Sequence, residues 1–119
     1  GKTILGACIL VMGMTFKENV ADIRNSKVVD IINELKDFGV EVDVVDPYAD
    51  PEEVKKMYGF RLIEKPLGNY DAVAVAVAHD AYQGLDEKYF KSLTCDKAVL
   101  VDVKGMYRDK IHELKYWSL

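Results

Sequence analysis

The chain has 119 residues, of which 50% are hydrophobic and 30% are charged, and its formal net charge is -4. A chain of this length forms one domain, spanning 1–119, and is long enough to bury a core without disulfides or metals as staples. The acidic balance and the scattered basic residues argue against a protein that coats nucleic acid, so any anion site has to be local.

The first half of the chain alternates between strand and helix patterns. Apolar runs that are too short for a helix predict buried strands, and apolar residues spaced three or four apart predict helices. Ser26 and Asp50 are suited to begin the two helices, and Gly39 and Gly59 supply the left-handed positions that end them. The predicted elements are a strand at residues 9–12, a helix from Ser26 to Phe38, a strand at 40–45 and a short helix at 50–58.

The second half begins with a brief predicted strand at residues 60–63 and continues with the sequence AVAVAV at 72–77. Such a continuous run of small apolar residues is typical of a central parallel strand that is covered on both faces. A helix at 86–93 and a strand at 98–103 follow. The tail predicts a helical turn at 111–114 and ends in Tyr116 and Trp117. We expect this apolar end to dock on its own domain, with contact to another domain or subunit as the alternative.

Strands that alternate with helices predict an α/β fold, namely a Rossmann-like three-layer sandwich with a mostly parallel sheet of about five or six strands. In such sheets, ligands bind beside the carboxyl ends of the strands. The two cysteines, Cys8 and Cys95, have no metal-ligand spacing, and no apolar run approaches the ~20 residues that span a bilayer. We therefore expect a cytoplasmic protein without a metal site or a membrane contact.

The loop after the first predicted strand carries Phe16, Lys17, Asp22 and Arg24. Lys17 is a compact charge that can meet a phosphate, Arg24 offers a planar fork for two phosphate contacts, and Phe16 could line a base or a sugar. The alternative is a solvated loop in which Arg24 pairs with Asp22. Gly13 stands alone where a dinucleotide fingerprint needs three glycines, so we do not expect this loop to build an NAD site.

Three further strand ends carry polar candidates, each with two interpretations. Asp46 stands where a Rossmann acid would hold a ribose, but the proline after it favours a turn-forming Asp-Pro. His79 could hydrogen-bond a ligand at the edge of the site, or could only cap its strand end. Lys104 could join Lys17 around a diphosphate, or could pair with Asp102 on the surface.

Four runs of the sequence carry a resemblance to a known family: GMTFKENVADIRNS, GVEVDVVDPYAD, AVAVAHDAY and VDVKGMYRDKIHELKYWSL. Together they resemble the C-terminal, UDP-binding domain of the UDP-glucose/GDP-mannose dehydrogenase family, and within it the bacterial UDP-N-acetylhexosamine 6-dehydrogenases. The resemblance covers nearly the whole chain. Its most specific part is the pattern F-K-x(4)-D-x-R, followed by a capped helix and a strand that ends in Asp-Pro.

The resemblance implies that the chain is one domain of a larger enzyme, a homodimer or higher oligomer. That enzyme would oxidise the C6 alcohol of a UDP-hexose or UDP-N-acetylhexosamine to a carboxylate, giving a uronic acid for surface polysaccharide. NAD would be bound mainly by an N-terminal domain, and the catalytic cysteine and lysine would lie in a central region. By the same resemblance Phe16 and Lys17 contact the substrate and Arg24 reaches toward NAD. Lys104 stands where the glucose branch has a substrate arginine.

The chain departs from the full family pattern because it contains neither the dinucleotide fingerprint nor the catalytic cysteine motif. We therefore expect no catalytic residue in it and no dehydrogenase activity from it alone. Three other readings stay open. A receiver-like signalling module would need a carboxylate pair for Mg²⁺ after the first strand, which residues 13–17 lack. A plain NAD-binding domain lacks its glycines, and a non-catalytic assembly module would use Tyr116 and Trp117 as its contact surface.

Overall fold

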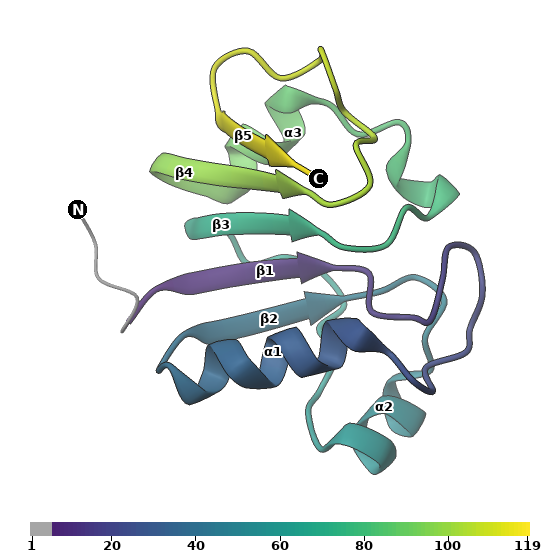
Figure 1. The fold of residues 1–119 in the computed structure, drawn as a ribbon. Helices are drawn as coiled ribbons and strands as arrows, with labels where there is room; N and C mark the ends of the chain where they lie inside the picture. The colour runs from purple at the N-terminus through teal and green to yellow at the C-terminus, as the bar shows by residue number, and fades with distance from the viewer. Residues whose placement is uncertain (1–5) are drawn as a thin grey trace.

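The structure is a computed structural model that describes residues 6–119. Its five strands form a single sheet in the order β2-β1-β3-β4-β5, and all neighbouring strands are parallel. The arrows in Figure 1 accordingly all point the same way. The strands are β1 (Cys8–Met12), β2 (Glu41–Val45), β3 (Tyr70–Val75), β4 (Thr94–Asp102) and β5 (Lys115–Ser118), and the helices are α1 (Lys27–Asp37), α2 (Pro51–Tyr58), α3 (Glu87–Leu93) and the 3₁₀ turn η1 (Asp80–Tyr82). The predicted Rossmann-like α/β sheet is confirmed.

Local sequence signals set the helix ends. The side chains of Ser26, Asp50 and Asp86 each accept a hydrogen bond from a backbone N–H in the first turn of the helix that follows. Such caps satisfy N–H groups that have no partner inside the helix. Gly59 ends α2 with a left-handed φ of 81°. Among the described residues, no helix combines the length and the apolar character that crossing a membrane requires.

The core lies in two layers, one on each side of the sheet. On one side α1 covers β1 and β2, with Val11, Ile32 and Val44 buried between them. On the other side α3 lies behind β4, and Phe90 and Tyr107 pack against the sheet. Figure 1 shows α1 in front of the sheet and α3 behind it. These layers leave the carboxyl ends of the strands, where loops gather, as the place for a site.

Two predicted elements are absent from the structure. Residues 60–63 form no strand, because the segment runs along the edge of β2 and one backbone bond joins it there, from the Ile63 N–H to the Val44 carbonyl at 2.9 Å. Residues 111–114 form no helical turn; residues 112–114 are bends that lead into β5, which pairs with β4. Tyr116 packs on the core and donates a hydrogen bond to Asp102, so the tail docks on its own domain as expected.

The carboxylate of Glu87 holds the segment that precedes β5. It accepts hydrogen bonds from the backbone N–H groups of His112, Glu113 and Leu114 at 2.8 to 3.1 Å. These donors, chiefly that of Leu114, lower the pKa of Glu87. A carboxyl group whose folded pKa is lowered contributes stability above its unfolded pKa of about 4.3, and that stability is lost as the pH falls through the folded value.

Glu87→Gln is therefore expected to lower the melting temperature at pH 7. The deficit should shrink in acid, where the wild-type carboxylate also becomes protonated. Thermal unfolding followed by circular dichroism at pH 7 and near pH 3 measures both effects. Glu34→Gln, which changes an exposed acid of α1, is the control and should leave the melting temperature nearly unchanged. Equal shifts for the two variants would contradict the role of Glu87.

Candidate functional site

The loop from Gly13 to Ser26 begins where β1 meets the end of β3. Gly13 has a φ of 91°, and a Cβ built on it would lie 2.7 Å from the Cβ of Val77. Only glycine fits this close approach without strain. At the other end of the loop, the Ser26 hydroxyl donates to the Met14 carbonyl at 2.6 Å while it also caps α1. Both ends of the loop are therefore fixed to the sheet and to the helix.

Asp46 anchors the same loop from the end of β2. Its Oδ2 accepts hydrogen bonds from the backbone N–H groups of Met14 at 2.7 Å and Thr15 at 3.3 Å. Its Oδ1 accepts from Tyr48 and Ala49, which is the geometry of an Asx turn. The turn interpretation of Asp46 is confirmed. The ribose interpretation is wrong for this arrangement, because the side chain is fully buried and its oxygens are engaged.

His79 lies beneath the loop and is completely buried. Its Nδ1 accepts a hydrogen bond from the Asn19 backbone N–H at 2.9 Å, and its Nε2 lies 3.0 Å from Asp46 Oδ2. Because Nδ1 accepts, Nε2 carries the proton and donates to Asp46. The Asn19 amide oxygen in turn accepts from the Asp80 N–H at 2.8 Å. His79 thus joins the loops after β1, β2 and β3 from the inside and does not face solvent.

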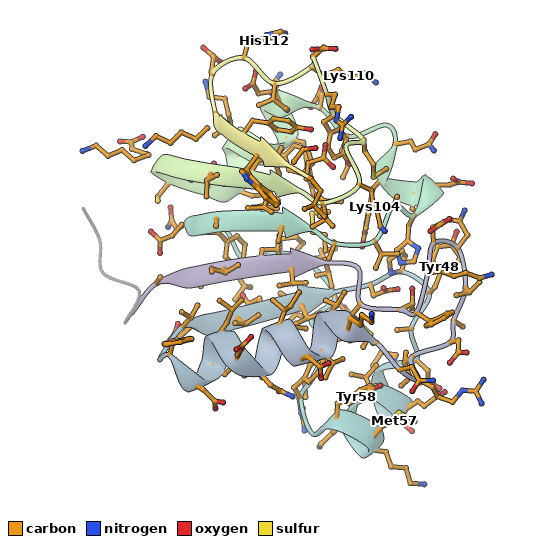
Figure 2. All side chains as sticks on the ribbon, viewed as in Figure 1. Tyr48, Met57, Tyr58, Lys104, Lys110 and His112 are labelled. Atoms are coloured by element: carbon orange, nitrogen blue, oxygen red, sulfur yellow. The ribbon has the colours of Figure 1, made fainter. Side chains whose placement is uncertain are left out.

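The anchored loop presents Phe16 and Lys17 to solvent, and Phe16 is 56% exposed although it is a large apolar side chain. Both residues line a pocket of about 370 Å³ together with Lys104, which follows β4. Figure 2 shows Lys104 at the edge of the sheet toward which the strand arrows point. The lining residues are Thr15, Phe16, Lys17, Glu18, Asn25, Lys27, Val28, Ile31, Ala76, Val77, Val103 and Lys104. The structure therefore brings three of the predicted residues into one site.

The charge at this pocket is opposite to that of the whole chain. Three lysines and one glutamate line it, whereas the chain carries a net charge of -4. Lys104 does not form the surface pair with Asp102 that was the alternative for it. Asp102 is buried and accepts hydrogen bonds from the Met106 and Tyr107 N–H groups, which leaves Lys104 exposed at the pocket. The local excess of positive charge suits an anionic ligand.

Lys27 is a member of the site that the sequence patterns did not single out. It is the first residue of α1 and lines the pocket. A lysine at this position opposes the helix dipole, which favours acidic residues in the first turn. That mismatch was the available signal, and it is consistent with a position that serves an anion.

Arg24 lies apart from the pocket. Its side chain is 73% exposed, and its guanidinium pairs with Asp22 through two hydrogen bonds of 3.0 Å. Hydrogen bonding to Arg24 lowers the pKa of Asp22, and the same bond raises the pKa of Arg24. The predicted Arg24–Asp22 pair is thus present. The structure does not bring Arg24 together with Lys17 and Lys104.

A second pocket, of about 460 Å³, opens at the end of β2 beside Tyr82 and Tyr89. Its walls are mainly apolar and include three prolines. Its lining includes two acidic residues, Glu64 and Asp46, of which the carboxylate of Asp46 is buried and hydrogen-bonded, and neither lysine nor arginine contributes to it. This larger pocket therefore does not suit a diphosphate, and the pocket at Lys17 and Lys104 is the better candidate.

Comparison with known proteins gives a family match. The family model described as "UDP-glucose/GDP-mannose dehydrogenase family, UDP binding domain" matches residues 10–109. The chain is 38% identical over 105 residues to the UDP-N-acetyl-D-glucosamine 6-dehydrogenase of Salmonella typhi, covering 87% of this chain and 25% of that protein. It is 43% identical over 107 residues to Protein CapL of Staphylococcus aureus, covering 89% of this chain and 25% of that protein.

A solved structure with a similar fold is the crystal structure of the NDP-N-acetyl-D-galactosaminuronic acid dehydrogenase from Methanosarcina mazei Go1. Its TM-score is 0.84 at 22% sequence identity, and the match covers 100% of this chain and 25% of that chain. At this identity the likeness concerns the fold alone. The chain spans about a quarter of the length of each of these relatives.

Proposed function

Since the chain belongs to the UDP-glucose/GDP-mannose dehydrogenase family as its UDP-binding domain, we propose that it holds the nucleotide part of a UDP-sugar in the pocket at Phe16, Lys17 and Lys104. The observation that carries this proposal is the local excess of lysines beside an exposed phenylalanine, at the carboxyl edge of a parallel sheet. The other large pocket has the wrong charge for this ligand.

Different residues of the pocket contact different parts of the ligand. The ammonium groups of Lys17, Lys27 and Lys104 neutralise the diphosphate, and the first turn of α1 adds backbone N–H groups that favour an anion. The ring of Phe16 provides an apolar surface for the base or the sugar. His79 and Asp46 act indirectly, because they hold the loop that presents Phe16 and Lys17.

We propose further that the chain is one domain of a cytoplasmic, NAD-dependent enzyme, a homodimer or larger. That enzyme oxidises a UDP-hexose or UDP-N-acetylhexosamine to its uronic acid. The chain alone does not fit NAD, because Gly13 packs against Val77 and no glycine cradle follows it. The cofactor and the catalytic residues then belong to the rest of the polypeptide. Arg24, which does not line the pocket and pairs with Asp22, is a candidate contact to NAD.

Titration of the ¹⁵N-labelled chain with UDP tests the binding site. Saturable shifts are expected in the loop at residues 16–24 and around Lys104, with a dissociation constant on the order of millimolar because only part of the site is present. Lys17→Ala should weaken binding roughly tenfold, as expected for the loss of a charge-assisted contact. Uridine, which lacks the diphosphate, should bind more weakly than UDP.

Lys88→Ala is the matched control, because Lys88 is an exposed lysine of α3 and lies outside the pocket. It should leave the affinity for UDP unchanged. Equal affinity of the wild type and Lys17→Ala would contradict the proposed site, as would shifts confined to the pocket at Tyr82 and Tyr89. If the isolated chain binds no UDP, the same comparison is made in the full-length polypeptide, where Lys17→Ala should still weaken binding.

A further inference from the structure

One row of paired residues crosses the sheet on the side of α1, from Val44 on β2 through Val11, Ala74 and Val101 to Trp117 on β5. Val44 and Val11 are buried beneath α1, at 1% and 3% exposure. Ala74 and Val101 are only partly buried, and Trp117 is 50% exposed. Burial therefore decreases along the row with distance from α1.

The neighbouring row, which faces the other side of the sheet, does not show this decrease over β1, β3 and β4. Leu10, Val73 and Leu100 are paired across these strands, and each is at most 1% exposed. The segment with α3 and Tyr107 covers them. One side of β3–β5 is thus covered, and the other is open among the described residues, so the prediction that the central strand is covered on both faces is wrong for this part of the chain. We call the open side the open face; it is formed by Ala72, Ala74, Val99, Val101 and Trp117, with the exposed Lys115 at its edge beside Val99. Figure 1 shows no helix in front of β3, β4 and β5.

An open apolar face is unusual for a parallel sheet, because parallel sheets occur almost always with both faces covered. Residues of β3, α1 and β5 lie around the open face. The residues of β3 on this face are alanines, and the exposed apolar residues Ile31 of α1 and Trp117 of β5, at 55% and 50% exposure, belong to the elements on either side of β3 and β4. Strands lie about 4.8 Å apart and packed helices 8–10 Å apart, so the space over β3 and β4 fits one helix beside α1.

We propose that the open face is covered by an apolar side of a helix from the remainder of the parent polypeptide. This inference rests on the proposed function, in which the chain is one domain of a larger dehydrogenase. Two observations favour that occupant over a second copy of the chain. The chain spans only a quarter of the relatives' length. The open face is also continuous with the candidate site, because Ile31, Ala76 and Val103 line the pocket next to Lys104. A helix seated there would complete one wall of the pocket.

Hydroxyl-radical footprinting with mass spectrometry tests the proposal, because Trp117 is the only tryptophan of the chain. Met57 on α2 is the internal control, since it is 48% exposed and lies far from the open face. Figure 2 shows Met57 at the opposite end of the molecule from β5. Oxidation rates are compared between the 119-residue chain, after its fold has been checked by circular dichroism, and the full-length polypeptide. Trp117 should react several-fold more slowly in the full-length polypeptide, and Met57 should react equally in both.

Equal Trp117 rates in the two proteins would overturn the proposal. Protection of Trp117 that rises with the concentration of the 119-residue chain, together with a doubled mass in sedimentation, would overturn it in favour of a second copy. As a second test, Ile31→Lys in the full-length polypeptide should raise the reactivity of Trp117 several-fold, whereas Met57→Lys should not. Footprinting uses no nucleotide, so a failure of UDP binding and a failure of this inference give different results.

Discussion

Asp46→Ala is expected to destabilise the domain by about 3–5 kcal/mol, which is a large part of the stability of a domain of this size. The substitution removes the acceptor for four backbone N–H groups, those of Met14, Thr15, Tyr48 and Ala49. It also removes the shorter of the two contacts of the buried His79 Nε2, which leaves only the Thr15 hydroxyl at 3.4 Å. Unsatisfied buried donors keep their full desolvation cost, so several small losses add up at one residue.

Urea unfolding followed by circular dichroism measures this cost. Asp50→Ala is the matched control, because the Asp50 carboxylate accepts one backbone N–H at the start of α2 and is exposed. Loss of such a cap costs about 1 kcal/mol. If the two alanine variants unfold at the same urea concentration, the contacts of Asp46 contribute no more stability than a single helix cap, which would contradict the prediction. Asp46→Asn, which keeps the size and one acceptor oxygen, should fall between them.

The contacts of Asp46 also show which parts of the site follow from sequence patterns. The turn made by its Oδ1 is local, with partners two and three residues along the chain, and the Asp-Pro pattern predicts it. The contact of its Oδ2 with His79 spans 33 residues, and that of His79 with Asn19 spans 60. No pattern within a window of sequence carries such pairings. For this reason the sequence predicts His79 at the edge of the site, whereas the structure places it beneath the loop.

The same distinction between local and long-range contacts explains which helices and strands could be predicted from the sequence. The caps at Ser26, Asp50 and Asp86 and the apolar runs of β1 and β3 are local signals, and the structure follows them. The strand β5 has no such signal, because Lys115–Ser118 alternates without an apolar run and becomes a strand only by pairing with β4. Residues 60–63 are the opposite case: their apolar pattern predicts a strand, but the segment does not pair fully with any strand and forms none.

The lysines of the pocket show which distant residues can be predicted to lie together once local strand patterns are combined with the parallel topology of the sheet. Lys17 and Lys104 are 87 residues apart in sequence, yet both follow parallel strands, and parallel strands bring their carboxyl ends to one edge. Their shared pocket could therefore be predicted from the strand pattern. Lys27 belongs to a helix start, where no rule for strand ends applies, and only the three-dimensional fold places it in the same pocket.

Gly13→Ala is expected to destabilise the domain by roughly 2–5 kcal/mol, for two reasons that act together. The residue has a φ of 91°, which an L side chain rarely adopts, and the new Cβ would lie 2.7 Å from the Cβ of Val77 and 3.0 Å from its backbone nitrogen. The nitrogen belongs to the main chain just beyond β3 and cannot move alone. Relief of the clash must therefore separate the end of β1 from the end of β3.

Gly59→Ala separates the two causes, because Gly59 has a φ of 81° and its added Cβ would meet no atom within 4 Å. It should cost about 1–2 kcal/mol from the backbone alone, and the difference between the two variants measures the contact with Val77. Equal destabilisation would show that this contact is unimportant. The two variants should also differ in UDP binding. Val77 lines the pocket and Gly13 begins the loop that carries Lys17, so Gly13→Ala should weaken binding even at temperatures where the domain remains folded, whereas Gly59→Ala should not.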